Sequence, residues 1–326
     1  MPQTVTGPRA HVDAAHLARR PSSVRRTTTI DMTWPRGPAG PLHMAGLGRD
    51  LATSGDRTTD VLDHAVLDAA LDTSRVLTSV MIAPHVVDLT ALAGHPVGSG
   101  YRRRLATAVP AERGAGTLVH LLLDDLVGAS IVSDFALRSW HLYDETPNSR
   151  TPRRMVGLCT GFTEGSTALH PDGTSTGRHM TLAVAPLTDD VDPVGWHAIP
   201  AVDGVTMRRA RRLDVWTADG KVVVDAMFQD SSSDPAGERR AVHEYRIALT
   251  ADIGSGRITT LDATPRTLPY QECPFATASL DRLLGTPLRE LRDSVPSVLR
   301  GTAGCTHLND ALRGLSDLPG LLSRLR

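Results

Sequence analysis

The sequence of 326 residues is poor in lysine and cysteine, and both shortages are informative. Lys221 is the only lysine among 35 basic residues, and this preference for arginine, together with abundant alanine and glycine, is typical of a GC-rich bacterial genome. Three cysteines cannot form a disulfide framework for a chain of this size, so a reducing, cytoplasmic location is expected.

The chain also lacks any excess of charge, any long apolar run and several common motifs. The 35 basic and 36 acidic residues nearly cancel, which gives no long-range attraction to nucleic acid or to an anionic membrane. No apolar run approaches the roughly 18 residues that a membrane helix needs, and the N-terminus lacks the apolar core of a signal peptide. The motifs GxGxxG, GxxxxGK, HExxH and CxxC are absent, so nucleotide-dependent and HExxH-type hydrolase chemistries have no positive support. The expected partner is a small molecule, and the composition also allows a homo-oligomer.

The order of predicted elements repeats along the chain. VRRTTTIDM (24–32) corresponds to MRRARRLDVW (207–216), and further hairpins and helices follow in matching order over about 100 residues. The run 61–71 fits a strand or a helix by its period. We predict an α+β fold, built by internal duplication of an antiparallel β-hairpin pair followed by helices on one face of the sheet. Its parts are a flexible arm (1–22), a first, degenerate repeat (23–144), a linker or lid (145–205), and a second repeat with the candidate site (206–326).

The segment 145–205 has no counterpart in either repeat. It is rich in glycine, proline, threonine and aspartate, and a stretch of this length without clear elements is usually a linker or a functional lid. An inter-repeat linker is the simpler interpretation. A lid is the alternative, because Cys159, His170 and His179 lie in this segment.

The two repeats differ in their reactive residues. The second repeat carries Cys273, Cys305 and His307 near predicted helix starts, where our alignment places Ala83, Val119 and Leu121 in the first repeat. Reactive groups in one copy and aliphatic groups in the other indicate one functional site and one structural copy.

Cys305 lies just before a predicted helix. There the unpaired N–H groups and the helix dipole would stabilise a thiolate and lower the pKa of the thiol. His307 follows two residues later, and the two side chains converge only if Cys305 precedes the first helical turn, an entry that Gly301 and Gly304 permit. The alternative is that Cys305 and Cys273 are small buried hydrophobic residues, as free cysteines usually are.

Four further features have both a functional and an ordinary interpretation. His243 is a candidate base or ligand, although strand histidines more often bond to a backbone group. Asp230 could anchor a base, but a turn aspartate is the commoner case. Tyr270 lies beside Cys273 in a stretch that is either a site loop or a plain connection. The arginines of 208–212 could clamp a phosphate or carboxylate, but strand alternation favours a solvated edge.

The motif GCTHL (304–308), preceded by PYQEC (269–273) and the RRLDVW…DGK…FQDS run, resembles the bacterial domain of unknown function family 2889. The resemblance covers about residues 206–316, and the SVRRTTTID opening is similar to the longer actinobacterial members. It implies no activity. The positions that match the family pattern are His243, Tyr270, Cys273, Gly304, Cys305, Thr306, His307 and Leu308.

Residues 258–291 are more weakly similar to iron–sulfur-cluster scaffold proteins, in which a cysteine opens a helix after a sheet edge. The chain departs from them because no third cysteine adjoins His307. The similarity therefore implies a related fold without the cluster.

Together these residues favour a small-molecule enzyme of bacterial metabolism, with a hydrolase- or lyase-type reaction on an acyl or aromatic substrate. The alternative is a non-catalytic zinc-binding or scaffold-like protein, in which Cys273, Cys305 and His307 hold the metal. A third interpretation is a structural duplication with merely buried cysteines. The catalytic candidates are Cys305, His307, Cys273, Tyr270, His243 and Asp230.

Overall fold

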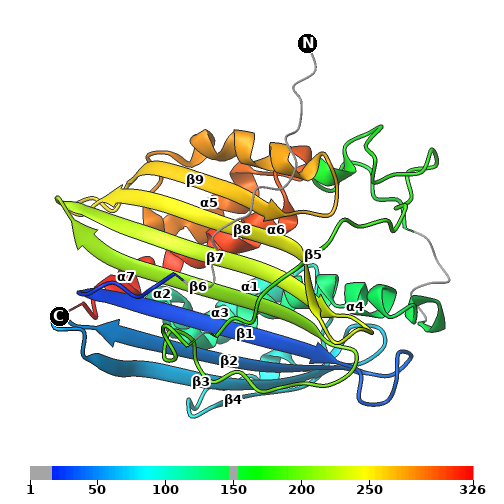
Figure 1. Cartoon of the computed structure of the whole chain (residues 1–326), viewed down its shortest axis with the longest axis horizontal. Coiled ribbons are helices and arrows are strands. Elements are labelled where there is room, and N and C mark those ends of the chain that lie inside the picture. Colours follow the sequence, from blue (N-terminus) through cyan, green and yellow to red (C-terminus); the bar gives the residue numbers. More distant parts are fainter. Residues whose placement is uncertain (1–16, 147–152, 189, 326) are drawn as a thin grey trace.

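The computed structural model describes residues 17–146, 153–188 and 190–325, and its strands form one antiparallel sheet (Figure 1). The strands are β1 (Ser23–Thr33), β2 (Leu42–Thr53), β3 (Thr59–Leu71), β4 (Leu77–Ala83), β5 (Leu182–Ala183), β6 (Met207–Ala218), β7 (Lys221–Ser233), β8 (Arg239–Asp252) and β9 (Ile258–Thr267). They lie in the order β4–β3–β2–β1–β6–β7–β8, with β9 and the short β5 both paired to β8. Two four-stranded meanders thus meet where β1 pairs with β6.

The helices pack on one face of this sheet (Figure 1). They are α1 (Tyr101–Ala108), α2 (Pro110–Ala115), α3 (Leu118–Val132), α4 (Asp134–Ser139), α5 (Leu291–Val298), α6 (Thr306–Gly314) and α7 (Leu318–Leu322), with 3₁₀ turns between them, the longest being η6 (Cys273–Leu283). The fold is therefore α+β, as predicted, and the run 61–71 belongs to strand β3. The duplication itself stays a prediction. None of the described helices is long and apolar enough to cross a membrane.

The apolar core has two main parts, one under each meander. Helix α3 is buried along nearly its whole length, because leucine and valine occupy most of its positions, and it contacts β1, β2 and β3. In the second half, η6, α5, α6 and α7 cover β7 and β8 with buried leucines. Helices α3 and α6 also touch each other, so the two halves share one layer of helices.

The arginines of β6 are buried, which contradicts the predicted solvated edge. Strand β6 pairs with β1 on one side and β7 on the other, so it lies in the middle of the sheet. Each guanidinium is paired with carboxylates: Arg209 with Asp230 and Asp310, and Arg211 with Asp125. Arg208 pairs with Asp31, and Arg212 with Asp214 and Asp225. Buried charges are tolerated when paired and hydrogen-bonded in this way.

Residues 190–205 cross the sheet face opposite the helices (Figure 1). Trp196 packs with Ala210 and Met227, and the two ring nitrogens of His197 lie 2.9 Å from the hydroxyl oxygens of Thr27 and Thr29. The middle of the sheet is thus covered on both faces. Residues 1–16 of the predicted arm lie outside the described residues.

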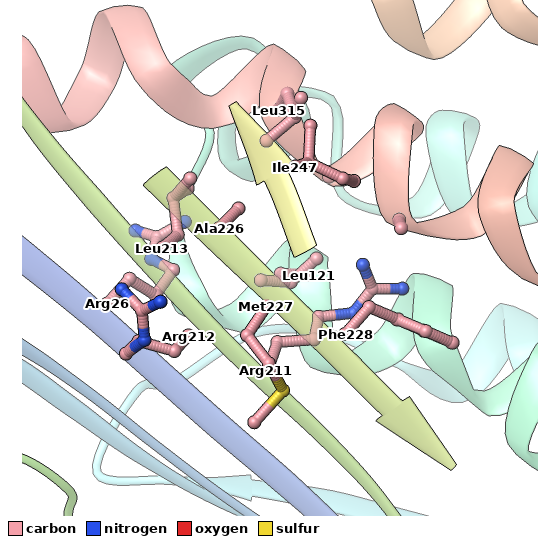
Figure 2. A pocket seen from close by; sticks show the side chains of 12 residues that line it. Arg26, Leu121, Arg211, Arg212, Leu213, Ala226, Met227, Phe228, Ile247 and Leu315 are labelled. Atoms are coloured by element: carbon pink, nitrogen blue, oxygen red, sulfur yellow. The ribbon is translucent and has the colours of Figure 1, made fainter. Parts of the chain in front are cut away.

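A small cavity lies between the sheet and the helices near the junction of the two halves (Figure 2). Its volume is about 20 Å³, and Arg211, Phe228 and Leu315 are among its lining residues. That volume holds about one water molecule, which is too small for a substrate. The cavity therefore marks imperfect packing around buried arginines.

The burial of His197 predicts acid sensitivity. Burial, with the nearby charges of Arg49 and Arg208, lowers its pKa to about 3, against about 6.5 in an unfolded chain. Below pH 6.5 the unfolded state therefore binds a proton that the folded state does not. Because of His197 alone, the free energy of unfolding therefore falls by about 1.4 kcal/mol per pH unit as the pH drops from 6.5 toward 3.

We expect the free energy of unfolding of His197→Asn to fall less steeply between pH 6 and pH 4 than that of the wild type. The difference should be about 1.4 kcal/mol per pH unit, as measured by urea unfolding at several pH values. His170→Gln, at an exposed turn, is the matched control and should leave the slope unchanged. A variant slope equal to that of the wild type would show that His197 is not the group responsible.

Candidate metal centre

Three predicted residues converge between the sheet and α6. Asp230 lies on β7, His243 faces it on β8, and His307 lies in the first turn of α6. The pairing of β7 with β8 shifts register just after Asp230, and a bulge of this kind redirects side chains. His243 Nδ1 lies 3.9 Å, and His307 Nε2 3.8 Å, from the same Asp230 Oδ2 atom. One potential ligand atom from each residue thus lies within 4.8 Å of the others.

Asp230 is a fully buried strand residue, which contradicts the prediction of an ordinary turn aspartate. Arg209 donates from Nε to Oδ1 (2.9 Å) and from Nη2 to Oδ2 (3.0 Å), and its Nη1 donates to Asp310 (3.0 Å). Gly128 of α3 makes room for this contact, since a Cβ there would lie 1.9 Å from Arg209 Nη1. The first half of the chain therefore helps to fix the carboxylate.

Both imidazoles are neutral at neutral pH. Burial, reinforced by the charge of Arg209, lowers the pKa of His307 to about 3, and burial beside His307 lowers the pKa of His243 well below its usual value. The rings stack with centroids 3.4 Å apart and planes 16° from parallel. A neutral imidazole offers a lone pair to a metal, so the site presents two nitrogen ligands and one carboxylate oxygen.

The ring nitrogens are arranged for a cation. His307 Nδ1 lies 3.3 Å from Thr306 Oγ1 and 3.9 Å from Cys305 Sγ, either of which can accept its proton. Nε2, which faces Asp230, then keeps its lone pair free. His243 Nδ1 is buried and has no hydrogen-bond partner within the described part of the chain. A buried, unpartnered nitrogen opposite an anchored carboxylate fits a metal ligand.

Cys305 has the expected position but not the expected ionisation. It is the extended residue that precedes α6 (φ −121°, ψ 131°), which lets its side chain meet that of His307. However, burial raises the pKa of Cys305, outweighing the N–H groups of the helix start, and burial raises the pKa of Cys273 to about 12. Both are therefore neutral thiols, so the helix terminus does not create a thiolate nucleophile.

Three residues of the 145–205 segment, Thr160, Ser175 and His179, lie beside Gly304 or Tyr270. Thr160 donates from its backbone N–H to the carbonyl of Gly304 (2.9 Å), next to Cys305. The ring of His179 lies 5.4 Å from that of Tyr270, and the Tyr270 hydroxyl lies 3.3 Å from Ser175 Oγ. Tyr270 thus packs against this segment. The exposed His170 makes a local turn instead.

The predicted residues separate into two adjacent groups. The ligand atoms of Asp230, His243 and His307 lie within 4.8 Å of one another. Among the described residues, the predicted set of Cys273, Cys305 and His307 does not satisfy this limit.

The sequence analysis did not identify Arg209 as the residue that holds Asp230. The sequence does show the arginine run 208–212. Its role in holding carboxylates can be recognised only when the aspartates that pair with it are known.

Residues 207–319 match the model of a family described as a protein of unknown function (DUF2889), which confirms the resemblance seen in the motifs of the second half. No curated protein and no solved structure matches the chain. The match contains Asp230, His243 and His307 together with Arg209, whereas Cys159 and Gly128 lie outside it. The weaker likeness to iron–sulfur scaffold proteins stays a prediction.

The neutral thiols predict slow alkylation. In metal-free folded protein at pH 7.5, we expect iodoacetamide to label Cys273 and Cys305 at least about 100-fold more slowly than in the urea-unfolded chain, because thiolate is the reactive form. Peptide mass spectrometry over a time course measures both rates. Labelling of Cys305 as fast in the folded as in the unfolded chain would restore the activated-thiolate interpretation.

Proposed function

We propose that this chain is a cytoplasmic bacterial enzyme that acts on a small molecule by a metal-dependent reaction of the hydrolase or lyase type. Asp230, His243 and His307 would hold the metal, zinc being the simplest choice for two imidazoles and a carboxylate. The proposal rests on one observation. One ligand atom each from Asp230, His243 and His307 lies within 4.8 Å of the other two, and these residues are largely buried.

The number and type of ligands favour catalysis over a structural role. Structural zinc sites are usually closed by four protein ligands rich in cysteine, whereas catalytic sites use three and leave a position for water or substrate. Among the described residues, the group that meets has three members and no cysteine. A bound zinc ion would supply a Lewis acid and a water of lowered pKa.

The chain's own residues would prepare the site. Arg209 holds the Asp230 carboxylate in one orientation through two hydrogen bonds. Thr306 Oγ1 and Cys305 Sγ lie where they would accept a proton from Nδ1 of His307 and leave Nε2 free for the metal. Tyr270, with Phe162 at 5.5 Å and His179, would supply the aromatic contacts for an acyl or aromatic substrate.

One observation favours the alternative of a non-catalytic zinc protein. The side chains of His243 and His307 are only 10% and 13% exposed, so substrate would have to approach through a narrow opening. A zinc ion that serves folding would need no such approach. The two functions differ in whether metal-loaded protein turns over a substrate.

The first test is metal content. Protein loaded with zinc and then desalted should retain about one equivalent, with nitrogen and oxygen ligands at about 2.0–2.2 Å by X-ray absorption. Asp230→Asn should lose the ion, because the anionic ligand is gone. Asp31→Asn is the matched control, since Asp31 is also buried and is held by two hydrogen bonds from Arg208, outside the ligand group. Retention of zinc by Asp230→Asn, or sulfur ligands at about 2.3 Å, would contradict the ligand set.

The second arm separates enzyme from zinc-holding protein. A panel of chromogenic acyl esters of aromatic alcohols is assayed with zinc-loaded wild type, with Asp31→Asn and with His307→Gln. Turnover by the first two, and its loss in His307→Gln, supports the enzyme. One equivalent of zinc without turnover, together with a large drop in unfolding temperature on zinc removal, supports the non-catalytic protein.

A further inference from the structure

Arg138 of α4 carries a positive charge that no carboxylate among the described residues neutralises. Its side chain is half-buried, and its guanidinium carbon lies 3.3 Å from the centroid of the Tyr143 ring. The guanidinium makes neither a hydrogen bond nor an ion pair with another described residue, whereas each arginine of β6 binds at least one aspartate. Stacking on an aromatic face leaves the edge of the guanidinium open. Arg138 therefore presents N–H donors in the planar arrangement that fits a carboxylate.

The space beside this guanidinium is open. Gly177 faces it with a φ of +65°, and an added Cβ there would lie 3.4 Å from Arg138 Nη1. Apart from the chain neighbours of Gly177, no other described residue comes within 4 Å of that position. Ser175 Oγ accepts a hydrogen bond from the Gly177 N–H group (3.2 Å) and lies 3.3 Å from the Tyr270 hydroxyl. The lack of a side chain at Gly177 thus leaves room for a small ligand group next to the positive charge.

A row of aromatic rings begins one helical turn from Arg138. Phe135 lies three residues before Arg138 on α4, which places both side chains on one side of the helix. The His179 ring packs edge-on against Phe135, with 5.1 Å between centroids, and lies 5.4 Å from the ring of Tyr270. Burial, reinforced by the charge of Arg138, lowers the pKa of His179 to about 4, so this imidazole is neutral at neutral pH. The row is thus an uncharged aromatic surface next to a guanidinium.

Helix α4 is fixed against the strand that carries Asp230. Ser139, the residue after Arg138, has its Oγ atom 3.1 Å from Ser232 Oγ on β7. Ser232 lies two residues beyond Asp230, a span of about 7 Å along a strand. The end of α4 therefore contacts β7 at a distance from the proposed metal ligand that is close to the length of a small aromatic molecule.

We propose that Arg138 binds the carboxylate of an aromatic acid, whose ring packs against His179 and Tyr270. The charge favours a carboxylate, because one guanidinium balances its single negative charge, whereas a phosphate monoester carries nearly two. This assignment deepens the proposed function and rests on it for turnover, since the substrate would be an acyl or aromatic compound that also carries a free carboxylate. Binding of the acid itself requires only Arg138 and the aromatic row.

Titration of the metal-free full chain with benzoate, followed by the NMR line widths of the ligand, tests this site independently of zinc. Benzamide is the comparison ligand, because it has the same ring and nearly the same shape but no charge. The wild type should bind benzoate at least about tenfold more tightly than benzamide, since hydrogen bonds to a charged group contribute more than neutral ones.

Arg138→Gln is the decisive variant, and Arg178→Gln is its matched control. Arg178 is an exposed arginine next to His179, and its side chain makes no hydrogen bond or ion pair with another described residue, so Arg178→Gln removes the same charge from the same neighbourhood. Arg138→Gln should bind benzoate at least about tenfold more weakly than the wild type, with binding of benzamide unchanged. Arg178→Gln should match the wild type for both ligands. Arg138→Lys keeps the charge but loses the paired donors, and it should also weaken benzoate binding. Urea unfolding checks that each variant is folded.

Equal affinity of the wild type for benzoate and benzamide would overturn the site, and so would equal benzoate affinities of Arg138→Gln and Arg178→Gln. Inorganic phosphate that binds more tightly than benzoate would overturn the assignment to a carboxylate. Zinc content is measured in parallel on the wild type and on Arg138→Gln. One retained equivalent in both leaves the proposed function standing if benzoate fails to bind, whereas benzoate binding by a wild type that holds no zinc supports this site and refutes the proposed function.

Discussion

Buried pairing of arginine with aspartate is the interaction on which the arrangement of the two halves depends. Asp124 of α3 accepts from Arg292 and Arg313 of the second half, and Asp317 accepts from Arg292 and from Arg26 of β1. Leaving one such partner unpaired costs about 3–5 kcal/mol, so the charges strongly disfavour any other packing. The pairs thus set the position of the helices over the junction of β1 and β6.

The same interaction reaches the candidate metal centre. Arg209 bonds at once to Asp230 of the ligand group and to Asp310, one turn beyond His307 in α6. One guanidinium therefore fixes the strand ligand relative to the helix that carries another ligand. Gly128 of α3 leaves the necessary space, which gives the first half of the chain a role in a site that it does not line.

The local parts of the fold could be predicted from the sequence. The α+β class and the entry of Cys305 into α6 both follow from residue patterns of short range. The pairing of β1 with β6 could not be predicted in this way, because it joins strands far apart in sequence. Without it, the arginines of 208–212 look like a solvated edge.

The chemistry of the site was predicted less well than its residues. Asp230, His243 and His307 were all candidates, but their grouping depends on a β-bulge and on the placement of α6. The ionisation of the cysteines was predicted in the wrong direction, because the helix start is visible in the sequence whereas the depth of burial is not. Desolvation outweighs the helix dipole at this depth.

The account is tested most directly by the zinc dissociation constants of Arg209→Lys and Arg211→Lys. Both arginines lie on β6, stack 4.8 Å from the ring of Phe228 and bind a buried aspartate, but only Arg209 holds a ligand of the metal. Each lysine keeps the charge and loses the paired hydrogen bonds. We predict that Arg209→Lys weakens zinc binding about 10- to 100-fold, and that Arg211→Lys leaves it nearly unchanged. An unchanged zinc dissociation constant in Arg209→Lys would contradict the claim that Arg209 positions the metal centre.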